Sequence, residues 1–461
     1  MENRPKTYPW RRRRRKLLLA LSAVVILAVG GLSVLNWRNA RRYEQQIAAI
    51  RASGFPASVK ELEEWHPKPP PEENGAEVYQ KAFEARKGAG GEESYKKNLS
   101  EKMREESKQS RFSEALHKLV EQHLSENAEV LRLLHEAAKR PATRFPVDLS
   151  KGLNMDLSHL SKLRDSVRLL QLEAFIAAED GDANRAVEAI LAALAVRDSV
   201  RFEPLVISQL VGFALDGIIS ATVSRALGMG AYSEEQLLAL CTALQKAEDP
   251  RSMTCGLAGE RANVLMAFEH PEQMVGSDKW VQQMEQALPG AAGLLAGLIN
   301  LTGYTNWDRQ RYLSLMSEMI QVSQLPTYEA LPAMSALERR IQAERGWLPN
   351  MTDIVLPALA RVEESVARDQ ANLRAAYAAV AVERYRLVYN RAPERLDDLV
   401  PSFLETVPVD PFDGHPLRFR LEENGYLVYS VGIDLRDNNG EPPGQDQGPR
   451  GLGDLVLRVE R

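Results

Sequence analysis

The sequence predicts a mainly α-helical protein with an N-terminal transmembrane helix and a small C-terminal α+β domain. Three observations carry this prediction: an uncharged apolar run that begins at residue 17, helical spacing of apolar residues between 112 and 389, and short Pro- and Gly-rich strand patterns after Asn390. A chain of 461 residues has room for two or three domains. The net charge of −5 provides no field that would attract nucleic acid, and we expect none to bind.

Residues 1–16 are a basic segment, and residues 17–37 are the predicted transmembrane helix. About 20 apolar residues at ~1.5 Å per residue cross the ~30 Å hydrocarbon core of a bilayer. Trp10 and Trp37 bracket the run, as aromatic rings do at membrane interfaces. The basic residues favour a cytoplasmic N-terminus, which predicts a single-pass inner (cytoplasmic) membrane protein with the bulk of its chain periplasmic or extracytoplasmic. A cleaved signal peptide is the alternative, disfavoured by the length of the run.

Residues 38–111 are expected to form a juxtamembrane helix and a linker. The helix should continue through residues 38–53 and end near Gly54. The stretch "HPKPPPEENG" (66–75) is Pro-rich and predicts an extended break. Residues 87–110 are highly charged and poor in apolar side chains, which is typical of a flexible loop or an exposed helix.

Residues 112–350 have apolar side chains at three- and four-residue steps, which predicts an α-helical hairpin domain. The clearest hairpin covers 168–200, where two helices meet at Gly181-Asp182. It weakly resembles a tetratricopeptide-type unit, but no repeat of about 34 residues follows. We therefore expect an irregular array of hairpins. Residues 202–227 predict an apolar pair of core helices, and residues 288–304 predict a buried or amphipathic helix.

The chain has two cysteines, Cys241 and Cys255, both in helical sequence. An oxidising compartment would permit a disulfide between them. Two buried free thiols are the alternative. The sequence leaves both possibilities open.

Residues 351–461 predict a long helix that leads into a small domain. The helix should cover 351–389. Short strands follow at 416–421, 426–431 and 454–459, and Asn424-Gly425 is a strong hairpin signal between the first two. The expected result is a three-stranded antiparallel sheet packed against the long helix.

Four motifs of this region occur in a characteristic order: "AVERYRLVYNRAPERLDDLVP", "VPVDPFDGHPLRFR", "YLVYSVGID" and a final "DLV". Together they are similar to the C-terminal domain of the major pseudopilin of type II secretion systems. The resemblance covers about residues 360–461 and implies a pilin-like head and a link to a secretion system. The chain has "RRRRRKLLLALSAVV" in place of the family's processing site, so assembly into a pilus-like fibre is not expected.

The resemblance also implies a structural calcium ion. Asp434 and Asp454 match the first and closing acidic positions of the family's calcium loop, and Asp437 is the expected third ligand. Calcium takes about six to eight oxygen ligands, which this loop of Asp and Asn residues can supply. The alternative is plain turn chemistry, because Asp and Asn favour turns through local backbone hydrogen bonds.

Catalytic and cofactor motifs are missing from the sequence. It contains no HExxH, no GxSxG and no phosphate-binding glycine loop. Asp410 in "VDPFDGHPL" is expected to cap a turn and not to act in catalysis. We therefore predict a non-enzymatic scaffold or protein-binding protein, with the membrane and other envelope or secretion proteins as partners and no small-molecule substrate. The alternative is an extracytoplasmic enzyme whose site in the helical domain carries no recognisable motif.

Overall fold

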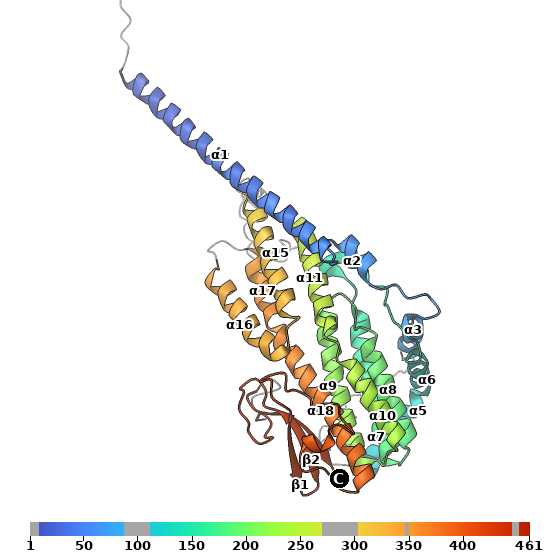
Figure 1. Cartoon of the computed structure of the whole chain (residues 1–461). Helices are drawn as coiled ribbons and strands as arrows, with labels where there is room; N and C mark the ends of the chain where they lie inside the picture. Colours follow the sequence, from blue (N-terminus) through green and yellow to red (C-terminus); the bar gives the residue numbers. More distant parts are fainter. Residues whose placement is uncertain (1–8, 87–110, 270–302, 346–349, 445–450) are drawn as a thin grey trace, which may run out of the picture.

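The computed structural model describes residues 9–86, 111–269, 303–345, 350–444 and 451–461. These residues form a mainly helical body with one three-stranded antiparallel sheet at its C-terminal end (Figure 1). The structure thus confirms a mainly α fold with a small C-terminal sheet. The predicted segment 87–110 and nearly all of 288–304 lie outside the described residues.

Helix α1 (Pro9–Ala52) is continuous, and its first half projects away from the body (Figure 1). Its second half packs against α15 (Tyr304–Val322), where Asn306 Nδ2 donates to Asn36 Oδ1 at 2.5 Å. The helix ends where the sequence predicts, because Gly54 adopts a φ of 79°. The Gly54 N–H then bonds to Arg51 O and the Phe55 N–H to Ile50 O, a Schellman C-cap.

One described helix is long and apolar enough to cross a membrane by length and composition alone, namely α9 (Val206–Met229). Within it, 61% of the most apolar window is buried by other parts of the protein. This burial is typical of a core helix. The predicted transmembrane helix at 17–37 is not among the spans that this test of length and composition finds in the described residues. Several of its side chains lie outside the described residues, and it stays a prediction.

The hairpin predicted at residues 168–200 is present as α7 (Ser158–Glu179) and α8 (Ala183–Asp198). Gly181 has a φ of 80° and allows the reversal. The Asp182 carboxylate caps α8 by accepting from the Arg185 N–H at 3.1 Å. Small buried residues such as Ala186 and Ala193 then let the two helices approach closely.

The prediction of two helices within residues 202–227 is wrong, because α9 is a single unbroken helix. It packs against α7, α8, α18 (Val362–Tyr389) and α11 (Arg251–Glu269), so tertiary contacts on several sides hold it continuous. Among the described residues, the body also contains α2 (Val59–Trp65), α3 (Ala76–Ala85), α5 (Glu114–Glu126), α6 (Ala128–Ala137), the 3-10 helix η2 (Leu149–Asn154), α10 (Glu234–Ala247) and α16 (Thr327–Ala343).

The long helix predicted at 351–389 is divided into α17 (Met351–Ala360) and α18, which meet at Arg361. Pro357 lies one turn before the junction and cannot donate a backbone hydrogen bond to Asp353. A single helix was therefore a wrong prediction at this point. The 3-10 helix η3 (Leu396–Leu399) follows α18 and packs against it.

The sheet consists of β1 (Arg418–Glu422), β2 (Gly425–Ser430) and β3 (Leu455–Glu460), with β2 in the centre. Glu422 pairs with Gly425, so the predicted hairpin turns through two residues. The sheet packs on α18, where the Tyr426 hydroxyl donates to Glu383 Oε1 at 2.9 Å. Strand β3 also meets α9 so closely that a Cβ at Gly228 would lie 2.1 Å from Glu460 O.

A buried charged cluster joins α8, α9 and α18. Arg197 Nε donates to Asp216 Oδ2 at 2.6 Å, and the Asp369 carboxyl lies close enough to interact electrostatically with both side chains. Arg197 is 2% exposed and Asp216 0%. Burial and the neighbouring Asp216 charge raise the pKa of Asp369 well above its usual value. Burial raises the pKa of Asp216 as well, so two carboxyls with raised pKa values lie near one buried guanidinium.

Arg197→Met is expected to destabilise the protein by about 3–5 kcal/mol at pH 8, because it leaves two carboxyls in the core without a cation. The loss should be smaller at pH 5. Burial raises the pKa of a carboxyl in the folded state, so its protonated form fits the core and stability falls as the pH rises. Urea unfolding of the full chain, followed by circular dichroism at both pH values, measures this.

Arg339→Met is the matched control, because Arg339 is an exposed arginine of α16. We expect a change within about 0.5 kcal/mol for this surface substitution. An equal loss at pH 5 and pH 8 for Arg197→Met would contradict the raised pKa values of Asp216 and Asp369.

Candidate functional site: an apolar pocket at the base of α1

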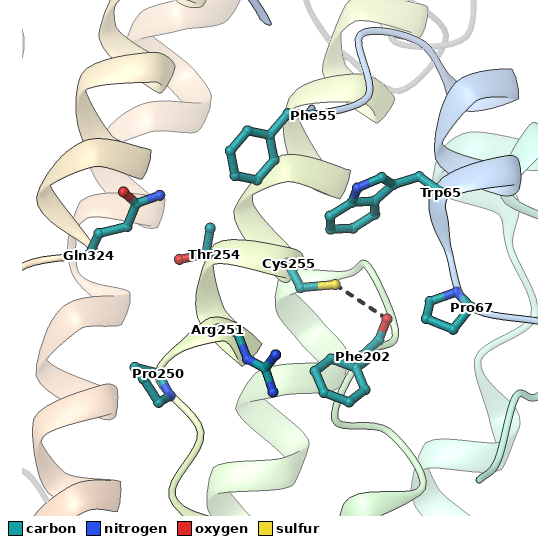
Figure 2. A pocket seen from close by; sticks show the side chains of 9 residues that line it. All are labelled: Phe55, Trp65, Pro67, Phe202, Pro250, Arg251, Thr254, Cys255 and Gln324. Atoms are coloured by element: carbon teal, nitrogen blue, oxygen red, sulfur yellow. Dashed lines mark hydrogen bonds between the residues drawn. The ribbon is translucent and has the colours of Figure 1, made fainter. Parts of the chain in front are cut away.

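A pocket of 560 Å³ lies where the end of α1, the end of α2, the start of α11 and the turn after α8 come together (Figure 2). Its described lining is mostly aromatic and apolar. The lining residues are Phe55, Trp65, Pro67, Phe202, Pro250, Arg251, Thr254, Cys255 and Gln324.

Two helix ends place the aromatic rings of one wall. The Schellman cap after α1 fixes Phe55 through its backbone N–H. Helix α2 is anchored by the fully buried Leu62 and is capped by Ser58 Oγ, which accepts from the Glu61 N–H at 3.3 Å. Trp65 is the last residue of α2, and its ring centroid lies 6.2 Å from that of Phe55. The rings face the pocket together (Figure 2).

The opposite wall comes from the first turns of α11. Arg251, Thr254 and Cys255 lie on one helix face, because residues three and four apart are neighbours on a helix. The Arg251 guanidinium lies 5.5 Å from the Phe202 ring centroid and binds Asp249 at 2.8 Å. Arg251 therefore lies at the rim of the pocket beside the exposed Phe202 ring, and Asp249 already neutralises its charge.

The chemistry of this pocket favours binding over catalysis. Cys255 Sγ donates to Phe202 O at 3.3 Å (Figure 2), and burial raises the pKa of this thiol to about 12. It therefore remains a thiol at neutral pH and is a poor nucleophile. Among the nine described lining residues, neither a carboxylate nor a histidine is present. The pocket offers apolar surface to a ligand and no acid–base pair.

Cys241 and Cys255 are both free and buried, so the structure contains the pair of thiols and not the disulfide. Burial raises the pKa of Cys241 to about 11. We expect an aromatic disulfide reagent to label neither cysteine rapidly in the native chain at pH 7.5. After denaturation without reductant, both should react. A single assay with and without guanidinium measures this, and fewer than two thiols in the denatured chain would indicate a bridge.

A second cleft, of 440 Å³, is polar and lies between α5, α6, α7 and α8. His135 Nε2 lies 2.8 Å from Glu173 Oε2, and Arg185 Nε donates to Glu173 Oε1 at 3.1 Å. Burial opposes ionisation of Glu173, but its bonds to His135 and Arg185 outweigh this and lower its pKa. A carboxylate that orients a histidine at a cleft is an arrangement used in general base catalysis.

The three predicted calcium ligands lie around the loop that follows β2. Asp454 is fully buried, and its Oδ2 accepts from the Asn438 N–H at 3.1 Å and from the Gly440 N–H at 2.6 Å. Asp437 Oδ1 accepts from the Tyr429 hydroxyl at 3.1 Å, and Asp434 caps Arg436 N–H at 3.2 Å. Turn chemistry is therefore present at Asp434 and at Asp437, whose Oδ1 also accepts from the Asn439 N–H at 2.9 Å, whereas Asp454 accepts from backbone groups 14 and 16 residues away.

These carboxylates partly fit a calcium site. In the described part of the chain, no three side chains of His, Cys, Asp or Glu are grouped to hold a metal ion. Calcium also accepts backbone carbonyl oxygens, so this finding does not decide the matter. Burial raises the pKa of Asp454, and the charges of Asp437 and Asp434 add to this effect. A cation would relieve that repulsion, and the calcium ion stays a prediction.

Millimolar calcium is expected to raise the melting temperature of the full chain. At a hundredfold excess of calcium over its Kd, the free energy of unfolding should rise by about 2.7 kcal/mol. Asp434→Ala and Asp437→Ala should lose this rise, with magnesium as the ionic control. Unchanged melting curves would reject the ion. Asp454→Asn should lower the melting temperature in either case, because a neutral amide oxygen is a weaker acceptor than a carboxylate for the two backbone N–H groups.

Asp410 caps its turn as the sequence predicts, and it also bonds to side chains outside the turn. Its carboxylate accepts from the Phe412 N–H at 3.0 Å, from Ser430 Oγ at 2.8 Å and from Arg418 Nη1 at 2.7 Å. It is fully buried and therefore joins the "DPFDG" turn to β1 and β2. Its role in the described structure is structural.

A scan against protein-family models and searches of curated proteins and of solved structures found no match. The resemblances to the pseudopilin head and to tetratricopeptide-type hairpins therefore stay predictions. Sequence reasoning missed the pocket aromatics Phe55, Trp65 and Phe202. A signal was available for Phe55, since a large apolar residue directly after a Gly helix cap often packs back on the helix.

Proposed function

We propose that this chain is a single-pass, membrane-anchored extracytoplasmic protein that binds other envelope proteins and has no enzymatic activity. The observation that carries the proposal is the exposed apolar half of α1. Leu19, Ile26 and Leu27 are 68%, 70% and 75% exposed there, along a helix half that projects from the body. Exposed apolar surface of this extent requires a cover, and the uncharged run fits the hydrocarbon core of a bilayer.

The pocket at the base of α1 supports the protein-binding role. It is open, its walls are aromatic, and it carries no catalytic pair among its described residues. We take its occupant to be an apolar segment of an envelope protein, in keeping with the predicted link to a secretion or pseudopilus-type system. The rigid packing of α1 on α15 would hold this pocket at a fixed distance from the membrane.

Membrane anchoring is tested by substituting Leu21 and Leu27 with Arg in the full chain. Each charge at the centre of a span costs about 2.5–3.5 kcal/mol, so the double variant should be released from membranes by alkaline carbonate. Leu238→Arg is the control, because Leu238 is 47% exposed on the body. Carbonate release of the wild type, or protection of its body from protease added to spheroplasts, would refute the proposal.

Partner binding is tested by placing a photo-crosslinking phenylalanine analogue at Trp65. Envelope or secretion proteins should be captured in cells, and Thr254→Trp should abolish the capture by filling the pocket. The same analogue at Leu238 is the control. Capture that survives Thr254→Trp would show that the pocket is not the binding site.

The alternative, an extracytoplasmic enzyme with its site in the helical domain, is favoured by one observation, the contact between His135 and Glu173 at the polar cleft. A screen of hydrolase substrates with the wild type and with His135→Gln tests it. Turnover that His135→Gln abolishes would replace the non-enzymatic proposal.

A further inference from the structure

A third cavity, of 270 Å³, lies between α11, η2, the start of α9 and the start of α17. Most of its described walls are aliphatic or thioether side chains. The lining residues are Gly152, Met155, Leu157, Leu205, Ile207, Glu260, Asn263, Val264, Met266, Ala267, Met351 and Val355.

Two polar side chains interrupt this apolar lining, and both belong to α11. Glu260 and Asn263 are three residues apart and therefore share one helix face. Within the described ranges, the Glu260 carboxyl has no hydrogen-bond or ion-pair partner, and its pKa is raised by burial alone. Asn263 Oδ1 is buried and also lacks a partner in the part of the chain that the structure describes.

A buried acceptor without a donor, such as Asn263 Oδ1, costs about 1–3 kcal/mol, and the half-buried Glu260 carboxyl loses part of its hydration. A protein cation, Arg261, is close to Glu260 in sequence but contacts other groups. Arg261, the next residue, donates to Pro56 O at 3.3 Å and lies 5.7 Å from the Phe55 ring centroid. The cavity is thus apolar, negative at one end and provided with two acceptors.

We propose that this cavity binds a small apolar amine, whose ammonium group donates to Glu260 and to Asn263 Oδ1. A primary ammonium has three donors and one positive charge, so it satisfies both acceptors and neutralises the carboxylate. Its apolar body would lie against Met155, Leu157 and Ile207. An engineered cavity of ~150 Å³ holds a benzene molecule, so 270 Å³ has room for a ring with a short aminoalkyl chain.

This site is independent of the proposed function, since it neither includes the pocket at the base of α1 nor requires a membrane. The probe is 4-phenylbutylamine, added to the detergent-solubilised full chain and followed by calorimetry and melting temperature. The controls for the ligand are 4-phenylbutanol, which keeps the body without the charge, and 5-phenylpentanoate, which reverses the charge. We expect the amine to bind at least tenfold more tightly than either control.

The variants separate charge from shape. Glu260→Gln should weaken amine binding at least tenfold, and it should not unfold the chain, since it replaces a half-buried acid by a neutral side chain of the same shape. Ala267→Leu should reduce binding of every probe by filling the cavity while Glu260 stays in place. Glu344→Gln, at an exposed glutamate of the body, is the matched control. Equal binding of amine and alcohol, unchanged binding to Glu260→Gln, or no binding of the amine would overturn the proposal.

Discussion

The contact between Arg197 and Asp216 is the constraint on which the rest of the body depends. It places a guanidinium in the core between α8, α9 and α18, where an unpaired charge would be prohibitive. Asp369 brings α18 into the same cluster, where burial and the Asp216 charge raise the pKa of its carboxyl. The charges can be satisfied in one relative arrangement of the three helices, whereas apolar contacts alone would tolerate several.

This constraint extends to the C-terminal sheet, because α18 and α9 are also the helices that the sheet covers. Tyr426 bonds to Glu383 of α18, and β3 reaches the backbone of α9 at Gly228. The sheet is therefore held by two helices whose mutual position the buried cluster has already set. A pilin-like head, if the predicted resemblance holds, would here be part of the helical core and not a separate module on a stalk.

Local sequence signals predicted the elements that depend on local chemistry. Gly181-Asp182 marked the hairpin of α7 and α8, Asn424-Gly425 marked the turn of β1 and β2, and Gly54 marked the end of α1. One error, the single helix at 351–389, overlooked the local signal of Pro357, and the others arose where distant residues decide the outcome. α9 stays whole because helices on several sides pack against it, and the partners of Arg197 and His135 lie on other helices. Neither the Arg197–Asp216 contact nor the His135–Glu173 contact has a spacing along the chain that would identify it from a single sequence.

The two cavities on α11 differ in chemistry because each helix face has a different neighbour. At the start of α11, Arg251 faces the turn at Phe202 and has Asp249 as its partner, so that pocket carries no free charge and suits an apolar segment. Farther along, Glu260 and Asn263 face mostly aliphatic walls, and among the described residues Asn263 Oδ1 has no donor. The first pocket gains binding energy by removing aromatic surface from water, and the second by pairing groups that folding leaves unpaired. Since the two sites gain from different interactions, a variant at one should leave ligand binding at the other unchanged.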